Sequence, residues 1–439
     1  MSRLSETTSV SSTNSLQRIP TSQLCPGMFL VRVMDSWWKS PFFSHGRLLK
    51  SSIEVQQLIC SGIQEVEIDT SKGVAVSSES EAECDEGMLE VTEAVSIMVS
   101  CDQEDVAART QRTGSPECES EESKVRAEIV QVREDVMAAV DGAFEGVKTG
   151  QPISQPVVHA AAQALVQQAL AYPALLAEVS LLDSLKQFDK TLYAHVVDTA
   201  VYSILLGLQL GWNDGALEKI GVAGLLHDVG YMRLPQNVVN AQWRGGSDCS
   251  LLQKHVVMAE ILLTRHGQFS SDIICMVKDH HVYLDGSGYP EDSGGQPASE
   301  SAQLLATVNY FDELLMMGGP VGSLPAALAL RRMYQEAKRR KFPIPFMDAM
   351  IRMLGVFPVG TVVQLSTDEQ AVVVKQNTDS GVKPQVEIFR NSDGKILEPP
   401  QVWDLAKDAN SRHDVSITRL LDPSEYSLDL QEFFNRDVE

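Results

Sequence analysis

Two clusters of histidines hold the residue types in this sequence that are best suited to chemistry. The stretch His280–Pro290 reads HHVYLDGSGYP, in which two adjacent imidazoles precede a glycine-rich turn. Upstream, the segment GVAGLLHDVGYMRLP contains the pair His227 and Asp228. His195 and His255 lie on apolar, helix-like segments on either side of that pair. This density of imidazole and carboxylate groups predicts a metal site that handles a phosphodiester.

The spacing of the paired residues limits how they can bind an ion. Neighbouring residues of a helix point about 100 degrees apart, because an α-helix has 3.6 residues per turn. His227 and Asp228 therefore cannot hold one ion as a flat chelate, and the same is true of His280 and His281. They can serve two neighbouring ions, or one ion with the carboxylate bridging. Two ions about 3.5 to 4 Å apart would clamp a phosphate and activate a bound water.

The alternative is that each histidine is a core residue with its polar atoms satisfied. A single buried histidine is commonly of that kind, but HD and HH pairs in one region are hard to explain by packing. Burial of so many titratable groups without a cation would leave unmet donors and repulsion. We therefore predict a metal site, with iron, manganese or zinc preferred over magnesium or calcium. The remaining histidines are predicted to be structural or surface residues: His45, His159, His266 and His413.

A helical domain over residues 156–354 is predicted to position these groups, so the fold class is mainly α. Its segments, such as VVHAAAQALVQQAL and AQLLATVNYFDELL, keep apolar residues three and four apart, which is typical of amphipathic helices. Asn213 and Gly211 supply cap and stop signals. Facing helices of a bundle are expected to project the ligands inward.

The regions on either side of the bundle have a different composition. Residues 1–15 are expected to be a disordered lead-in, and residues 16–76 a small α/β module with short strand-like runs. Residues 77–123 are rich in Glu, Asp and Ser, which predicts an acidic disordered linker. Residues 124–155 are predicted to form a connecting helix. In residues 355–439, β-branched runs such as GTVVQL and AVVVKQ predict a short antiparallel β appendage and a tail.

The overall composition argues against several classes of function. The chain of 439 residues has a net charge of −23, whereas DNA or RNA binding needs a basic surface that displaces counterions. The seven cysteines include no CxxC pair, as expected in a reduced, intracellular setting. The polar N-terminus lacks the apolar region of a signal peptide. The most apolar stretch, Leu192–Leu210, is interrupted by polar residues, so we predict no membrane insertion and a cytoplasmic protein.

At this point the motifs resemble those of the HD-GYP family, a branch of the HD phosphohydrolase superfamily. The resemblance covers roughly residues 193–354 and rests on His227-Asp228 followed by Val229-Gly230, on the paired histidines, and on DGSGYP. The segment QLCPGMFLVRV also resembles the domain often fused upstream of HD-GYP. The resemblance implies a bacterial signalling protein that hydrolyses cyclic di-GMP to pGpG or GMP. Its cofactors would be divalent metal ions, two of them in our prediction, with iron or manganese preferred.

The resemblance also implies roles for individual residues. The catalytic residues would be His227 and Asp228, and Tyr289 would lie beside the nucleotide. The implied metal ligands are His195, His227, Asp228, His255, His280, His281 and Asn309. The implied substrate-binding residues are Asp285, Gly286, Gly288, Tyr289, Pro290 and Tyr231.

Several positions depart from the family pattern, and all of them concern metal or phosphate. Asn309 stands where the family usually has a metal-bridging Asp; its amide cannot bridge ions as a carboxylate does, although its carbonyl oxygen can still ligate one. Tyr231 replaces a Lys after the HD pair, and Val282 replaces a Glu after the paired histidines. Thr191 stands where trinuclear members have an extra Glu, and Gly318–Val321 where some members have phosphate-binding cations.

Two functions therefore stay open at the level of sequence. The first is a metal-dependent cyclic di-GMP phosphodiesterase, slow or with an altered substrate preference. The second is a catalytically impaired member that acts as a nucleotide receptor, or as a scaffold for a partner such as a diguanylate cyclase. A third class, an HD enzyme for another nucleotide or phosphate ester, is disfavoured by the GYP turn. The oligomeric state is left open.

Overall fold

The structure, a computed structural model, describes most of the chain from residue 116 onwards and parts of the N-terminal region. The described residues are 16–25, 27–33, 47–48, 65–70, 72, 116–186, 192–235, 239, 249–265, 269–290, 298–316, 324–377, 381–407, 415–421, 426 and 430–435. Several features named above lie outside these residues: the lead-in 1–15, the linker up to residue 115, Thr191, Gly318–Val321, His45, His266 and His413. The chain divides into two units, Met1–Leu89 and Glu90–Glu439.

The first unit contains a small antiparallel sheet with the strand order β1-β4-β2-β3. Its Ile19, Leu30, Val66 and Ile68 are buried and form the apolar side of the sheet. The strand-like runs predicted in this region coincide with β2 and β4. The elements are β1 (Leu16–Pro20), the 3₁₀ helix η1 (Thr21–Gln23), β2 (Phe29–Val33), β3 (Arg47–Leu48) and β4 (Glu65–Asp69).

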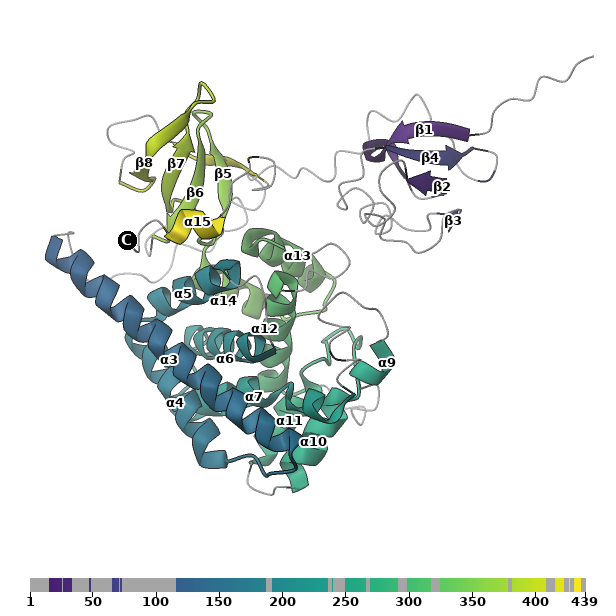
Figure 1. Cartoon of the computed structure of the whole chain (residues 1–439), viewed down its shortest axis with the longest axis vertical. Coiled ribbons are helices and arrows are strands. Elements are labelled where there is room, and N and C mark those ends of the chain that lie inside the picture. The colour runs from purple at the N-terminus through teal and green to yellow at the C-terminus, as the bar shows by residue number, and fades with distance from the viewer. Residues whose placement is uncertain are drawn as a thin grey trace, which may run out of the picture. The chain divides into compact units, whose positions relative to one another are not determined.

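The second unit is built mainly of helices, which confirms the predicted fold class (Figure 1). Its first helix begins at Pro116 rather than at residue 124, because acidic residues of the segment PECESEES are favourable in the first turns of a helix. The helices are α3 (Pro116–Lys148), α4 (Gln155–Ala171), α5 (Pro173–Lys186), α6 (Leu192–Gln209), α7 (Asp214–Leu226), the 3₁₀ helix η4 (Val229–Arg233), α9 (Cys249–Leu252), α10 (His255–Arg265), α11 (Ser271–Asp279), α12 (Glu300–Met316), α13 (Ala326–Lys338) and α14 (Ile344–Leu354).

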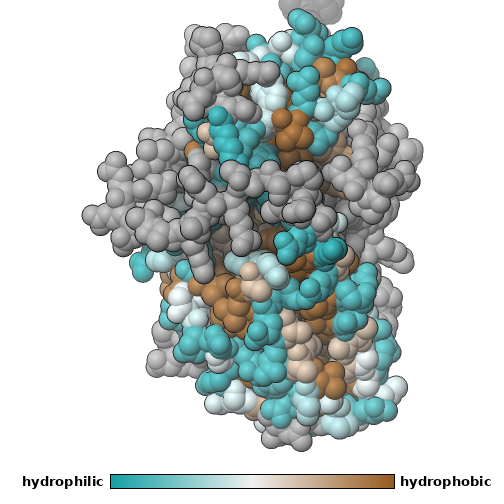
Figure 2. Space-filling view, turned by 90° about the vertical axis from the view of Figure 1, so that its left-hand side faces the viewer, coloured by the Kyte–Doolittle hydropathy of each residue, from teal (hydrophilic) through white to brown (hydrophobic). Residues whose placement is uncertain are grey.

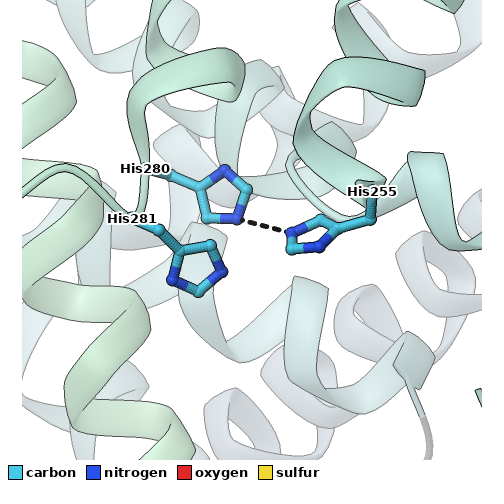
Figure 3. Close-up of side chains that lie close together, drawn as sticks. All are labelled: His255, His280 and His281. Atoms are coloured by element: carbon cyan, nitrogen blue, oxygen red, sulfur yellow. Dashed lines mark hydrogen bonds between the residues drawn. The ribbon is translucent and has the colours of Figure 1, made fainter. Parts of the chain in front are cut away.

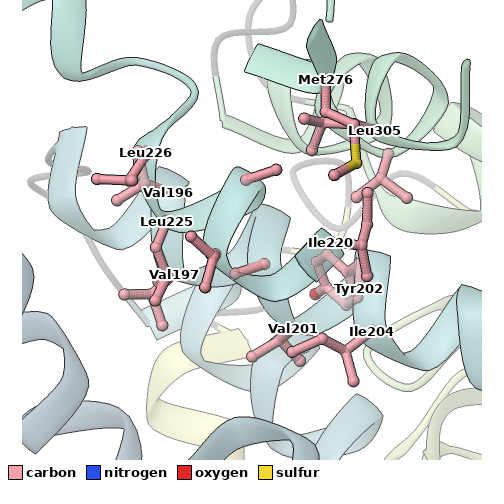
Figure 4. Close-up of a cluster of buried hydrophobic side chains, with 14 of the residues drawn as sticks. Val196, Val197, Val201, Tyr202, Ile204, Ile220, Leu225, Leu226, Met276 and Leu305 are labelled. Atoms are coloured by element: carbon pink, nitrogen blue, oxygen red, sulfur yellow. The ribbon is translucent and has the colours of Figure 1, made fainter. Parts of the chain in front are cut away.

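Helix α6 runs through the core of the bundle and is buried along most of its length. Its apolar side chains pack against those of α7, α11 and α12, as the cluster in Figure 4 shows. Helices α6 and α7 approach closely, since a Cβ atom on Gly224 would lie 2.6 Å from the Cα of Ala200. Each fully buried Leu or Ile of this core contributes about 1.5 to 3 kcal/mol. This packing fixes the ends of α6, α7, α11 and α12 relative to one another.

Helix α3 is attached to the bundle by a buried ion pair. Nη2 of Arg133 lies 2.6 Å from Oδ1 of Asp198 on α6, and Nη1 donates to Oγ of Ser180 on α5 at 2.7 Å. Arg133 and Asp198 are both almost fully buried. Because a buried charge is costly unless it is paired, this contact ties α3 to one position on α5 and α6.

The chain after the bundle forms a five-stranded antiparallel sheet in the order β8-β7-β6-β5-β9, which confirms the predicted β appendage. Val363, Val373 and Ile388 are among its buried residues. The sheet contacts the bundle where Lys375 Nζ lies 2.8 Å from Glu122 Oε2 of α3. The elements are β5 (Val362–Leu365), β6 (Gln370–Lys375), β7 (Gln385–Arg390), β8 (Ile396–Asp404), β9 (Ile417–Leu420) and α15 (Leu430–Asn435).

The surface mixes hydrophilic and hydrophobic residues on the face shown in Figure 2. Val157 and Leu170 of α4 are among the exposed large hydrophobic side chains. Within the described residues, no single helix combines the length and apolar character needed to cross a bilayer. Among the helices that the structure describes, α4 and Pro173–Leu182 have that length and apolar character when taken together, as a pair bent by 115°.

Candidate metal centre

The predicted metal ligands come together from five parts of the bundle. His195 lies on α6, His227 and Asp228 join α7 to η4, and His255 is the first residue of α10. His280 and His281 follow α11, and Asn309 lies on α12. All of these side chains are buried: His195, His227, Asp228, His255, His280, His281 and Asn309.

The ligand atoms form two groups of three. In one group, atoms of His195, His227 and Asp228 all lie within 4.8 Å of one another. In the other, the same holds for His255, His280 and His281, whose rings face one another in Figure 3. Each group is suited to hold one divalent ion, because three converging nitrogen or oxygen donors are the core of many catalytic metal sites.

The carboxylate of Asp228 faces both groups. Its Oδ2 lies 3.5 Å from Nε2 of His227 and 3.6 Å from Nε2 of His195. Its Oδ1 lies 3.2 Å from Nε2 of His255 and 3.7 Å from Nε2 of His280. The sequence left open whether the carboxylate would serve one ion or two, and this position suits a carboxylate that bridges two ions.

Three of the histidines are oriented by their own backbone. Nδ1 of His227 lies 2.7 Å from the carbonyl oxygen of Gly224, and His255 and His280 make the same contact with the carbonyls three residues before them, at 2.8 and 2.6 Å. A carbonyl oxygen can only accept, so the proton of each neutral ring is on Nδ1. Nε2 of each ring therefore presents its lone pair to the centre.

His195 is oriented by a carboxylate instead. Its Nδ1 lies 2.6 Å from Oδ2 of Asp312, a fully buried residue on α12. Such a carboxylate-histidine pair is a common support for a metal-binding imidazole. Asp312 is not among the residues predicted from the sequence. Its spacing of three residues from Asn309, on the same helix face, was the available signal.

The ring nitrogens of the two groups fit divalent ions because they converge in pairs. Nε2 of His255 and Nε2 of His280 are 3.2 Å apart, and neither neutral ring can donate to the other, because both have their proton on Nδ1. Nε2 of His195 and Nε2 of His227 are also 3.2 Å apart. A cation would bind the nitrogen atoms of each pair, and imidazole with carboxylate suits iron, manganese or zinc.

The charges of the centre favour neutral imidazoles around an ionised carboxylate. Burial lowers the pKa of His227 to about 3 and lowers the pKa of both His280 and His281. Burial alone would raise the pKa of Asp228, but the neighbouring imidazoles of His227, His255 and His280 hold it well below the usual value. Asp228 therefore stays ionised.

His195 differs from the other imidazoles. Burial lowers its pKa, but the hydrogen bond to Asp312 and the charges of Asp312 and Asp228 outweigh that effect and raise the pKa to about 9. The ring carries a proton at neutral pH, and a metal ion that binds Nε2 must displace it.

Asn309 lies at the edge of the first group. Its Oδ1 is 3.0 Å from Nε2 of His195, and its Nδ2 donates to Oε1 of Glu313 at 3.1 Å. Burial raises the pKa of Glu313. Glu313 is not among the residues predicted from the sequence, although it lies one helical turn after Asn309.

Tyr231, predicted to contact substrate, is buried against a histidine. Its ring stacks on His255 with a centroid distance of 4.3 Å and an interplanar angle of 16°. The preceding Gly230 allows this contact, because a Cβ atom there would lie 1.9 Å from the carbonyl oxygen of His255. Tyr231 thus supports the His255 ring.

The GYP turn folds back onto the paired histidines. Tyr289 N donates to the carbonyl oxygen of His281 at 3.1 Å, and the Tyr289 ring stacks on His281 at 4.4 Å. Gly288 has a φ of 97°, and a Cβ atom there would lie 1.9 Å from the His281 carbonyl oxygen. Asp285 Oδ1 accepts from both N and Oγ of Ser287. Asp285, Gly286 and Gly288 are exposed and Pro290 is half-buried, so the turn lies at the surface beside the buried centre.

A lysine that the sequence analysis did not name supports the other side of this turn. Lys341 Nζ lies 3.9 Å from the ring centroid of Tyr310 and 4.5 Å from that of Tyr283, which belongs to the turn. It also lies 2.9 Å from Oε2 of Glu336.

His159, which the sequence predicts to be a structural or surface residue, lies away from these groups in the chain. Its Nδ1 lies 2.6 Å from Oε1 of Glu218, and its ring stacks on Phe269, so its role is structural.

Comparisons with known proteins agree with this architecture. Residues 16–156 match a domain of unknown function (DUF3391), residues 170–342 match the HD domain, and residues 362–429 match a KOW domain associated with HD domain. The cyclic di-GMP phosphodiesterase PA4108 of Pseudomonas aeruginosa is 30% identical over 397 residues, 89% of this chain and 89% of that protein.

Two further matches are more limited. The 3'3'-cGAMP-specific phosphodiesterase 3 of Vibrio cholerae is 30% identical over 127 residues, 27% of this chain and 26% of that protein. A solved structure, Bd1817, a HDG"Y"P protein from Bdellovibrio bacteriovorus, is 16% identical with a TM-score of 0.42, over 76% of this chain and 98% of that chain.

The central bundle thus defines an HD domain protein with a histidine-rich centre. From its motifs and from the relative that it matches along most of its length, the chain belongs to the HD-GYP family.

Proposed function

We propose that this chain is a metal-dependent phosphodiesterase that hydrolyses cyclic di-GMP. The observation that carries the proposal is the convergence of imidazole Nε2 atoms from two groups on the two oxygens of the Asp228 carboxylate. That arrangement suits two divalent ions, with iron or manganese preferred. The name of the Pseudomonas aeruginosa relative, which matches this chain along 89% of its length, supports cyclic di-GMP as the substrate.

The residues of the centre have distinct tasks in this proposal. Two bound ions would clamp the phosphate and activate the attacking water. Asp228 stays ionised and serves both groups of imidazoles, and Asp312 keeps Nε2 of His195 directed at the centre. Tyr289, stacked on His281 beside the exposed turn, is placed to contact the nucleotide base.

A second candidate is a nucleotide receptor with little hydrolysis, or a scaffold that binds a partner such as a diguanylate cyclase. It is favoured by Asn309, whose neutral amide occupies a ligand position next to His195. In addition, Tyr231 occupies a position where the family pattern has a lysine, and its ring stacks on His255. We keep hydrolysis as the leading function because six predicted ligands converge in the bundle: His195, His227, Asp228, His255, His280 and His281. A cytoplasmic location is part of the same proposal.

Turnover measurements separate the two functions. Protein purified without oxygen and loaded with Mn²⁺ or Fe²⁺ is incubated with cyclic di-GMP, and separately with 3'3'-cGAMP, and products are resolved by chromatography. We expect linear products from cyclic di-GMP, and none from a His227→Ala, Asp228→Ala variant. Cyclic di-GMP that binds in calorimetry but is not hydrolysed above that variant would establish the receptor function instead.

A further inference from the structure

Asn309 and Glu313 form a hydrogen-bonded pair one helical turn apart on α12. Asn309 Nδ2 donates to Glu313 Oε1 at 3.1 Å, while Asn309 Oδ1 lies 3.0 Å from Nε2 of His195. Residues four apart lie on the same helix face, so both side chains point towards the centre's side of α12. Asn309 is buried, and Glu313 is half-buried beside it.

Glu313 holds the amide in one orientation. Its Oε1 accepts the hydrogen bond from Nδ2, so the NH₂ group of Asn309 faces Glu313. The carbonyl oxygen then faces His195 and the first group of ligands. Without Glu313, the amide could turn its NH₂ group towards the centre, and an NH₂ group cannot ligate a cation.

The charge of Glu313 also reaches the centre. It interacts electrostatically with His195, Asp228 and His255, and with Tyr283 and Tyr289 of the GYP turn. A bound divalent ion would favour the ionised form of Glu313, and the negative charge of that form would help to hold the ion.

We propose that Asn309 and Glu313 act together as a displaced carboxylate ligand, in which the amide oxygen faces the ion and Glu313 supplies the orientation and the negative charge. Glu313 is thus a positioning residue for the metal centre. This inference rests on the proposed function, because it assumes that the centre binds divalent ions.

One consequence concerns the change of Asn309 to Asp. An aspartate at position 309 has no NH₂ group to donate to Glu313, so two acceptor groups would face each other there and repel. Asn309→Asp alone should therefore improve metal binding little. In the Glu313→Ala background, by contrast, Asn309→Asp should strengthen metal binding about tenfold or more, because no second carboxylate then repels Asp at position 309.

The test measures Mn²⁺ binding directly, without activity. Free Mn²⁺ is quantified by electron paramagnetic resonance during titration of the full-length, metal-free protein and of four variants: Glu313→Ala, Glu313→Gln, Asn309→Asp and Asn309→Asp with Glu313→Ala. Glu313→Ala should raise the Mn²⁺ dissociation constant about 10- to 100-fold. Glu313→Gln keeps an oxygen that can accept from Asn309, so its loss should be smaller. Glu300→Ala, in the first turn of the same helix, is the matched control and should bind as wild type.

The outcomes separate this inference from the proposed function. A change of less than twofold in Glu313→Ala, or an equal effect of Asn309→Asp in both backgrounds, would overturn the inference while the metal centre stands. Failure of the wild-type protein to bind Mn²⁺ would overturn both. Thermal unfolding of each metal-free variant shows whether it folds, and the Gln variant keeps the test valid if the Ala variant does not.

Discussion

Asp228 Oδ1 lies 3.2 Å from Nε2 of His255, while the other oxygen of the same carboxylate faces His195 and His227. One side chain thus serves both groups of imidazoles. Asp228→Asn keeps the size of the side chain but leaves one oxygen, so only one group retains its acceptor. We expect the variant to bind about one ion fewer per chain and to lose hydrolysis by about 100-fold or more. Elemental analysis with turnover measures this, and Asp272→Asn, at a surface ion pair, is the control.

The two groups of ligands should lose their ions independently. His281→Ala removes a ligand from the group around His255, and His195→Ala removes one from the group around Asp228. Each variant should keep about one bound ion, because the other group is intact. The metal content of the two variants and of the double variant checks this. Complete loss of metal in either single variant would contradict separate ions.

The pKa of His195 should depend on Asp312. In metal-free protein, nuclear magnetic resonance should show a His195 pKa of about 9, and Asp312→Asn should lower it because burial then dominates. Because the pKa is raised in the fold, protonation of His195 stabilises the metal-free protein. This stabilisation is fully present below pH about 6.5, the pKa of histidine in the unfolded chain, and is lost as the pH rises through about 9. The free energy of unfolding of metal-free wild type should thus fall over that range, and the slope should be smaller in Asp312→Asn. An identical slope in both proteins would contradict this assignment.

The ion pair that holds α3 should matter for stability. Arg133→Ala removes the ion pair with the buried Asp198, which costs about 3 to 5 kcal/mol. Urea unfolding measures the loss. Lys219→Ala breaks the surface pair with Asp272 and should cost less than about 1 kcal/mol. Equal losses in the two variants would show that the buried pair has no special weight.

The histidines that converge in the structure could be predicted from the sequence because histidine pairs are rare and their motifs are local. Asp312 was not predicted, because its partner His195 is 117 residues away and the only local signal was its spacing of three residues from Asn309. Glu313 was not predicted for a similar reason, because its role depends on the orientation of the Asn309 amide, which the sequence does not show. Tyr231 was expected to face substrate, but its stacking on His255 depends on the close approach of η4 and α10. Helical periodicity predicted a helical bundle. The start of α3 was predicted too late in the chain, because the acidic residues of its first turns also favour disorder.

The contacts between ring Nδ1 atoms and carbonyls three residues earlier bear on how this centre tolerates change. In each case four consecutive residues contain both the coordinating ring and the group that aims it. Mutations elsewhere in the bundle can therefore alter the lining of the centre without rotating these three imidazoles. Selection could then tune the substrate preference of such a centre while its ability to coordinate ions persists.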